Sequence, residues 1–237
     1  GAAARDEGRA LAGEVLGLNA GDCTLMDDIV LGYAAHFAPG EGHLISAGTG
    51  SIGLHVRTDG SLVRVGGRGI LIDDAGSGSW IALEALNRIY RALDHDGSFA
   101  SVEVLAQNLH RQVGAAGWSD VRQFVYAGDR GRIGQLAMGV AEAAAAGDSV
   151  ALEILRQAGA ELAGLAEALL SRCGEAPVRL AGGVARLHPV ILEEMMTRLA
   201  GRDVRPANAD AALAAARLGS GGGDDWAALL QGGLSIA

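Results

Sequence analysis

Three short apolar runs between residues 43 and 66 constrain the fold more than any other part of the chain. The runs HLIS, IGLHV and LVRV are rich in β-branched residues, which favour strands. A turn of small residues, SAGTGS at 46–51, separates the first two runs. An Asp-Gly pair at Asp59 separates the last two, which is a strong hairpin signal. The sequence therefore predicts three neighbouring strands, with a hairpin at Asp59.

Most other apolar residues recur at helical spacing. They predict helices over residues 4–18, 29–37, 79–94 and 148–170, the last with Asp148 as its N-cap. The stretch APVRLAGGVARLHPV indicates a strand, a double-glycine turn and a helix that begins near its second proline. Strands followed by helices suggest an α/β fold. Ligands in such folds bind beyond the carboxyl ends of the strands, so the glycine turns are the first places to search.

Composition limits the classes of partner. A net charge of −9 argues against a broad nucleic-acid surface, which needs clustered Lys and Arg. The two cysteines, Cys23 and Cys173, exclude a disulfide scaffold, and the six histidines show no metal-ligand spacing. The sequence has no signal-peptide pattern and no apolar run near the roughly 20 residues of a membrane helix. We expect a soluble, cytoplasmic protein without a membrane partner.

The turn SAGTGS is the first candidate binding motif. Gly48, Thr49, Gly50 and Ser51 leave backbone amides uncovered and add two hydroxyl groups. Such a turn can wrap the terminal phosphates of a nucleotide. The alternative is an ordinary glycine-rich hairpin turn, because the spacing is not that of a Walker loop.

Two adjacent carboxylates, Asp73 and Asp74, form the centre of the second motif, GGRGILIDDAGSGSWIA at 66–82. Carboxylates beside a tight turn suit hydrogen bonding to sugar hydroxyls or to metal-bound water. The alternative is a helix cap, because either aspartate, Ser77 or Ser79 could cap the helix expected near Trp80.

Two further motifs lie near the ends of the chain. Gly182 and Gly183 form a strand-to-helix turn at which a flat ring or a ribose could approach the backbone, although such turns also occur without a ligand. Asp27 and Asp28 precede a predicted helix. Either aspartate could be a general base at the mouth of a cleft or a plain N-cap.

In this order, the four motifs resemble those of sugar kinases in the actin-like ATPase superfamily. The resemblance is to the N-acetylglucosamine kinase branch, which shares a sequence family with the BadF/BadG ATPases. SAGTGSIG is similar to the second phosphate loop, GGRGILIDDAGSGSWIA to the sugar-site signature and LAGGV to the adenosine loop. The resemblance covers nearly the whole chain. It implies two lobes, each a mixed sheet with helices, around a cleft for ATP, Mg²⁺ and a sugar.

The resemblance also implies roles for individual residues. Asp28 matches the residue that accepts the proton of the sugar hydroxyl, and Asp27, Gly50 and Asp74 match the sugar side. The ATP phosphates would lie against residues 48–51, and adenosine would lie against the double glycine. The implied reaction is phosphorylation of an amino sugar at its 6-hydroxyl, with N-acetylglucosamine or glucosamine as the expected substrate. Related kinases are often homodimers.

The sequence differs from the family pattern on the sugar side. Asp27 stands where Asn is usual, Ala75 where Glu is usual, and Arg68 where some members carry Trp. These differences leave the preferred amino sugar open. They also leave open which of the two aspartates at 27–28 is the base.

The Gly- and Thr-rich hairpin that forms the first phosphate loop of the family has no counterpart in the printed sequence. We therefore expect an incomplete first lobe. Residues 1–39 would be the remainder of the N-terminal lobe, 40–219 the C-terminal lobe with the phosphate, sugar and adenosine loops, and 220–237 a glycine-rich linker and helical tail.

Two other functions remain open on the sequence alone. The first is an ATPase activator of the BadF/BadG type, whose subunits hold an iron–sulfur cluster through paired cysteines. Cys23 and Cys173 are far apart in unlike contexts, which argues against that function. The second is a non-catalytic, sugar-binding pseudokinase, which the absence of the first phosphate loop favours.

Overall fold

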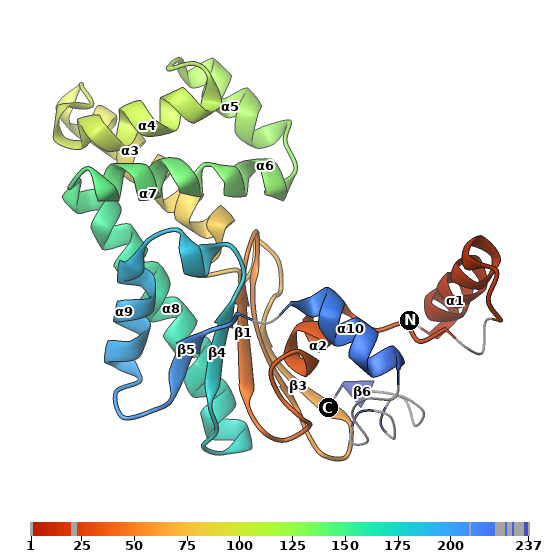
Figure 1. Ribbon diagram of the computed structural model, residues 1–237. Helices are drawn as coiled ribbons and strands as arrows, with labels where there is room; N and C mark the ends of the chain where they lie inside the picture. The colour runs from red at the N-terminus through yellow and green to blue at the C-terminus, as the bar shows by residue number, and fades with distance from the viewer. Residues whose placement is uncertain are drawn as a thin grey trace.

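A six-stranded mixed sheet forms the centre of the computed structural model, which describes residues 2–19, 23–208, 210–220, 226, 229 and 235–236 (Figure 1). Its strands in spatial order are β5 (Val204–Pro206), β4 (Val178–Ala181), β1 (His43–Ala47), β2 (Ser51–Val56), β3 (Ser61–Gly66) and β6 (Ser235–Ile236). Neighbours pair in parallel except at β1–β2 and β2–β3, which are antiparallel. The three predicted strands and the Asp-Gly hairpin are therefore confirmed.

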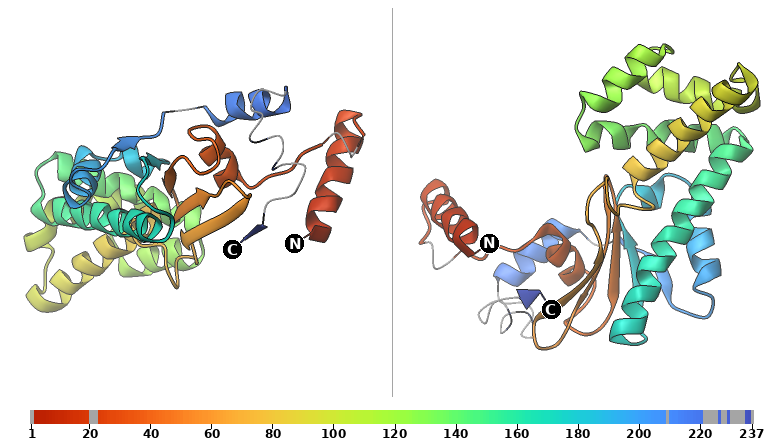
Figure 2. Two further views of the ribbon diagram at one scale, coloured as in Figure 1. Left: turned by 90° about the horizontal axis from the view of Figure 1, so that it is seen from below. Right: turned by 180° about the vertical axis from the view of Figure 1, so that it is seen from behind.

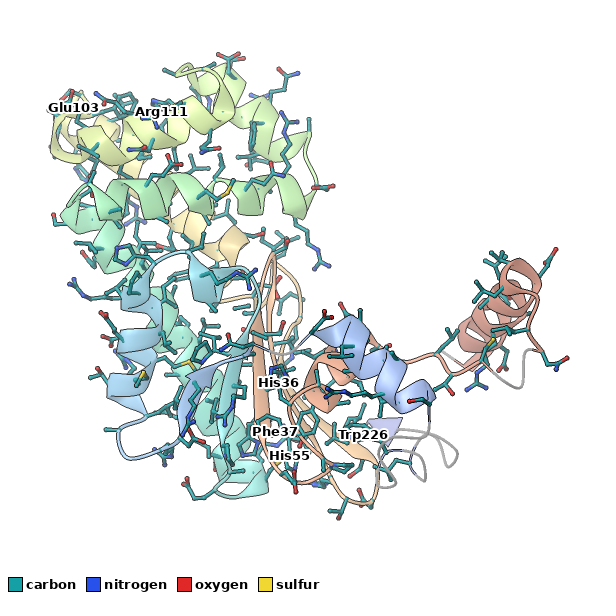
Figure 3. The ribbon with its side chains drawn as sticks, in the orientation of Figure 1. His36, Phe37, His55, Glu103, Arg111 and Trp226 are labelled. Carbon is teal, nitrogen blue, oxygen red and sulfur yellow. The ribbon has the colours of Figure 1, made fainter. Side chains whose placement is uncertain are left out.

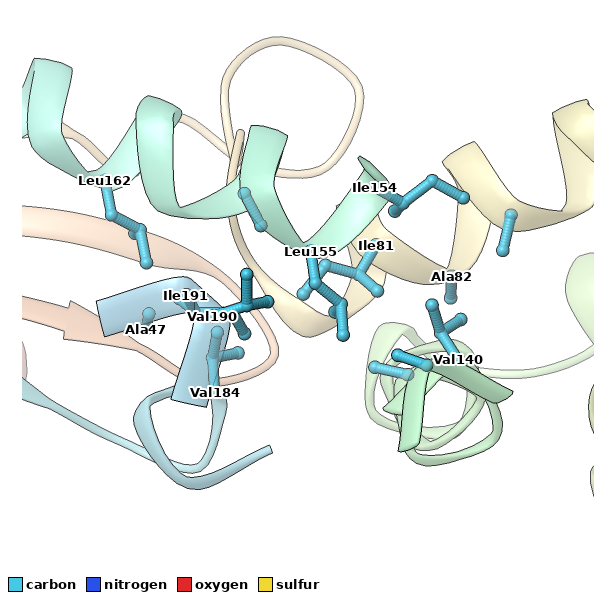
Figure 4. Packing of buried hydrophobic residues seen from close by; sticks show 14 of the residues in the cluster. Ala47, Ile81, Ala82, Val140, Ile154, Leu155, Leu162, Val184, Val190 and Ile191 are labelled. Carbon is cyan, nitrogen blue, oxygen red and sulfur yellow. The ribbon is translucent and has the colours of Figure 1, made fainter. Parts of the chain in front are cut away.

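Helices cover both faces of the sheet (Figure 2). The helices α8 (Ser149–Cys173) and α9 (Pro189–Arg198) lie on one face, and α2 (Asp28–Ala34) and α10 (Ala211–Gly219) lie on the other. The sheet separates two hydrophobic cores, and successive residues of β1 point into opposite ones. Leu44 packs with α2 in the smaller core, whereas Ile45 packs with α8 in the larger core. The larger core continues from the sheet into the helices beyond it (Figure 4).

The larger core extends into a layer of five helices beyond the end of the sheet at which β1 stops (Figure 1). They are α3 (Gly78–Asp96), α4 (Glu103–Val113), α5 (Trp118–Tyr126), α6 (Arg130–Gln135) and α7 (Ala137–Ala145). Among the described residues, the short 3₁₀ helix η2 (Ala100–Val102) precedes α4 in this layer, and a second one, η3 (Val184–Arg186), follows β4 and packs against α9. The helix α1 (Ala2–Leu16) lies apart from the sheet (Figure 2).

The predicted helices are present, with ends that differ by a few residues. Asp148 caps α8, since its carboxylate accepts the N–H of Ala151 at 2.9 Å. Pro189 is the first residue of α9, as its fixed φ favours. Within the described residues, no helix combines the length and apolar character that a bilayer crossing needs. The glycine-rich linker expected after residue 219 lies largely outside the described residues.

Two buried histidines lie where β1 begins and β2 ends. Their ring centroids are 5.0 Å apart, and His43 is fully buried. Nε2 of His43 donates to the carbonyl of Gly174 at 3.0 Å, and its Nδ1 has no partner among the described residues. Nδ1 of His55 (labelled in Figure 3) donates to the carbonyl of Gly42 at 2.8 Å, and the His55 ring meets that of Tyr33 edge to face, with centroids 6.3 Å apart.

Burial is the main reason that the pKa of His43 lies below its ordinary value of 6.5. The neighbouring His55 lowers the pKa further, whereas the hydrogen bond to Gly174 and the charge of Glu175 oppose the shift. The neutral form of His43 is therefore the one that the fold accommodates.

We predict that the protein loses stability as the pH falls below 6.5. The unfolded chain then takes up a proton at His43 that the folded chain resists, so protonation favours unfolding. Urea unfolding at about pH 8 and about pH 5.5 measures this loss, and His43→Gln should reduce it. The same pH dependence in the variant and the parent would contradict the assignment to His43.

The double glycine after β4 produces a second prediction. Gly182 has φ +96° and lies against β1, so an added Cβ would overlap the carbonyl oxygen of Ala47. Gly183 has φ −65° and open space around it. Gly182→Ala should therefore destabilise the fold by about 1–3 kcal/mol, while Gly183→Ala should not. Urea unfolding of the two variants tests this, and equal stabilities would contradict it.

Candidate functional site

A cleft of about 880 Å³ opens where the β1–β2 turn, α6 and η3 meet. Its lining residues are Gly48, Thr49, Gly78, Asp129, Gly131, Arg132, Gly134, Gln135, Ala137, Met138, Gly183, Val184 and Leu187. Five of these thirteen are glycines, so much of the wall is bare backbone. The cleft lies at the ends of the adjacent parallel strands β1 and β4, where α/β folds place ligands.

Backbone hydrogen bonds hold the β1–β2 turn against the start of α3. The N–H of Gly78 donates to the carbonyl of Gly48 at 2.8 Å, and that of Ser79 to the carbonyl of Thr49 at 3.4 Å. A Cβ on Gly78 would lie 3.2 Å from the Gly48 oxygen and 3.3 Å from the Gly134 oxygen. The turn, α3 and α6 thus meet so closely that their contact points have little room for a side chain.

Asp74 is a buried carboxylate beside this turn. It is 5% exposed, and its Oδ2 has no hydrogen-bond partner among the described residues. A Cβ on Gly50 would lie 3.0 Å from this Oδ2, so the absence of a side chain at Gly50 makes room for the carboxylate. Buried polar groups are normally satisfied, which makes Asp74 the group here that most needs a partner.

Of the residues in the second motif that could cap α3, Ser77 is the one that does so. Its Oγ accepts the N–H of Trp80 at 3.1 Å, which caps α3. Asp73 instead forms an ion pair of 2.9 Å with Arg68. The capping of α3 is therefore complete without Asp74.

The four residues predicted to hold phosphates have different surroundings in the structure. Gly48 and Thr49 line the cleft, whereas Gly50 faces Asp74. The Ser51 hydroxyl is buried and donates to the carbonyl of Ala75 at 2.7 Å. Ser51 therefore ties the turn to the Asp74 segment.

The two residues of the double glycine also have different surroundings. Gly183 lines the cleft, and Gly182 allows the chain to pass the end of β1 closely. The two segments meet because Ser46 in β1 pairs with Ala181 in β4.

Asp27 and Asp28 lie at the exposed start of α2, and neither lines the cleft formed by the described residues. Asp28 Oδ1 accepts the N–H of Ile29 at 2.7 Å. The hydroxyl of Tyr33, near the other end of α2, donates to the carbonyl of Val56 and accepts from Gly42, which lies just before β1. The helix therefore runs back toward the start of β1, so its Asp28 end is directed toward the cleft end of the sheet.

The sequence patterns did not predict the contribution of α6. Arg132 and Gln135 of α6, its N-cap Asp129 and Met138 of α7 line the cleft. The Arg132 guanidinium lies 4.2 Å from the centre of the Phe124 ring. A cation in this position can neutralise an anionic ligand. The available signal was the glycine spacing in GDRGRIGQ, because residues 131 and 134 lie on one face of a helix.

The bare backbone, the arginine and the buried carboxylate together suit a ligand with both anionic and hydroxyl groups. No three His, Cys, Asp or Glu side chains come together as a metal site in the described part of the chain. Magnesium that accompanies a nucleotide is held largely by phosphate oxygens and water, so the donors fit a metal brought in with a triphosphate.

Solved structures share this fold. A proposed N-acetylglucosamine kinase from Chromobacterium violaceum has 28% identity and a TM-score of 0.64, with 80% of this chain and 64% of that chain covered. A proposed N-acetylglucosamine kinase from Porphyromonas gingivalis has 15% identity and a TM-score of 0.58, with 78% and 62% covered. The chain therefore spans less than two thirds of either structure.

A glucokinase of the ROK family from Streptomyces griseus, solved with glucose and AMPPNP, has 15% identity and a TM-score of 0.53. The match covers 95% of this chain and 72% of that chain. A search of curated proteins found no match. The predicted actin-like ATPase fold is confirmed by the similarity to these structures.

The sequence pattern of one family spans most of the chain. The BadF/BadG/BcrA/BcrD ATPase family matches residues 23–217, which include the β1–β2 turn, Asp74, α6 and the double glycine. The chain belongs to the BadF/BadG/BcrA/BcrD ATPase family.

Proposed function

We propose that the cleft binds ATP and that the chain belongs to an ATP-dependent kinase that phosphorylates the 6-hydroxyl of an amino sugar. The observation that supports this most strongly is the placement of the buried Asp74 carboxylate beside the turn of Gly48 to Gly50, since its Oδ2 has no hydrogen-bond partner in the described part of the chain. One side of the turn faces the cleft and the other side faces the carboxylate. A phosphate donor and a hydroxyl-bearing acceptor could therefore meet at this turn.

The phosphates of ATP would lie along the turn at Gly48 and Thr49, near Arg132, and adenosine would lie against Gly183 and Val184. These residues share one cleft, and its volume of about 880 Å³ is within the range of cofactor sites. Magnesium, when bound with ATP, would neutralise charge on the phosphates. Residues 40–219 would form the lobe that holds the nucleotide, and residues 1–39 would be the remainder of the N-terminal lobe, whose helix α2 packs on the sheet of the other lobe.

Asp74 would accept hydrogen bonds from sugar hydroxyls, which supplies the partner that its buried oxygen lacks. Gly50, which lacks a side chain, leaves room for this carboxylate beside the turn. N-acetylglucosamine is the first candidate, because a protein with 28% identity is described as its kinase. Glucosamine is the second, because Ala75 has a methyl group where the family pattern has a carboxylate.

Asp28 would accept the proton of the 6-hydroxyl as the oxygen attacks the terminal phosphate, and Asp27 would contact the sugar beside it. Phosphoryl transfer depends mainly on positioning and charge neutralisation. Because Asp28 is exposed at the start of α2, it is accessible to a substrate that lies over this end of the sheet.

Release of ADP in a coupled assay, with and without N-acetylglucosamine or glucosamine, tests the proposal. A sugar kinase releases ADP only when its sugar is present. Release that no sugar changes would instead favour an ATPase activator. Sugar binding detected by calorimetry, together with no release of ADP in the coupled assay, would favour a pseudokinase.

A further prediction concerns the base. Asp28→Asn should lower turnover by about 10²–10⁴-fold and leave sugar binding nearly unchanged, because a positioned base acts mainly in the transition state. The matched control is Asp27→Asn, which should retain more activity. Parent-like turnover in Asp28→Asn would remove this residue from the mechanism.

Another prediction concerns sugar recognition. Asp74→Asn should weaken sugar binding about tenfold or more, because it replaces charge-assisted hydrogen bonds with neutral ones. Asp73→Asn, at the adjacent ion-paired aspartate, should have little effect. Calorimetry with each sugar measures both, and equal affinities in the two variants would contradict the role of Asp74.

A further inference from the structure

A second hollow, of about 530 Å³, is lined by residues of α3 and α5. Both helices belong to the helical layer beyond the sheet (Figure 1). We call this hollow the α3–α5 groove. None of its lining residues lines the first cleft. The base of the groove is apolar, since Leu86 and Val121 belong to the larger core and Leu83 and Val125 pack against it. Apolar hollows of this size with a few polar groups are typical of small-molecule sites.

Aromatic rings form the walls of the α3–α5 groove. Tyr90 and Trp118 meet edge to face, with ring centroids 4.9 Å apart. Trp118 is 56% exposed and Tyr126 is 81% exposed, although both are large apolar side chains. Exposed rings around a hollow offer a flat ligand apolar surface that is in contact with water when the groove is empty.

The polar groups of the α3–α5 groove favour an anion. Arg91 and Arg122 are exposed, and neither forms an ion pair with a residue that the structure describes. Asp94 is the one acidic residue in the lining, so the groove carries a positive charge on a protein of net charge −9. The Tyr90 hydroxyl is buried and has no hydrogen bond to any described residue.

We propose that the α3–α5 groove binds a small, flat aromatic molecule that carries a carboxylate, sulfonate or phosphate group. The rings of Trp118 and Tyr90 would cover its apolar part. The guanidinium groups of Arg91 and Arg122 would hold its anionic group, because their planar donors match such oxygens. This site is separate from the ATP and sugar sites, and it does not depend on kinase activity.

Anilinonaphthalene sulfonate is a suitable probe, because it is aromatic and anionic and becomes fluorescent when bound. Its uncharged analogue, N-phenylnaphthylamine, lacks only the sulfonate. We expect the anion to bind the intact chain at least about fivefold more tightly than the analogue. Arg122→Gln should remove most of this difference, and Trp118→Ala should weaken the binding of both probes about tenfold.

The matched control is Arg156→Gln, which removes one positive charge from an exposed site on α8, outside the groove. It should leave both affinities unchanged. Arg122 is exposed, so its variant tests the site even if Trp118→Ala disturbs α5. Equal binding of the two probes by the parent, or the same anion affinity in Arg122→Gln and the parent, would overturn the proposal. A dimer that Trp118→Ala dissociates in sedimentation would also overturn it, because the groove would then be covered by a second copy.

Discussion

The hydrogen bond from the N–H of Gly78 to the carbonyl of Gly48 joins the sheet to the helical layer at the candidate site. It fixes the β1–β2 turn against the first turn of α3. The Ser51 hydroxyl holds the segment just before α3 by donating to the carbonyl of Ala75. Asp74 lies close to these two contacts, directly before Ala75 in the chain and beside Gly50. The turn and the start of α3 thus share backbone polar groups at the edge of the cleft, and the Oδ2 of Asp74 beside them has no hydrogen-bond partner among the described residues.

Glycine makes this close contact possible in two ways. At Gly50 and Gly78 the missing side chain leaves space for a carboxylate or for backbone oxygens. At Gly182 the backbone also has a positive φ that other residues adopt at a cost. A glycine-rich wall is thus a requirement of packing as well as an opening for a ligand. Because close packing alone accounts for much of the glycine content, Asp74 and the shared cleft are the features that indicate a ligand.

The local parts of the fold were predictable, because their signals lie within a few residues. The strands at 43–66, the Asp148 cap and Pro189 at the start of α9 follow from such patterns. The contribution of α6 was not predictable, because it depends on the helical layer folding back over the β1–β2 turn. Spacing also could not decide between Ser77 and Asp74 as the cap of α3, since both precede the helix. The roles of the site residues remain predictions.

Hydrogen exchange with and without AMPPNP and magnesium tests most directly the central claim that the cleft binds ATP, because it measures the protection of backbone amides at the proposed contacts. We expect slower amide exchange in three separate segments, at residues 48–51, 130–138 and 183–187, which meet only in the folded cleft. The absence of slowing in these segments, with protection elsewhere in the chain, would show that the nucleotide binds at another place. That result would contradict the assignment of the cleft to ATP.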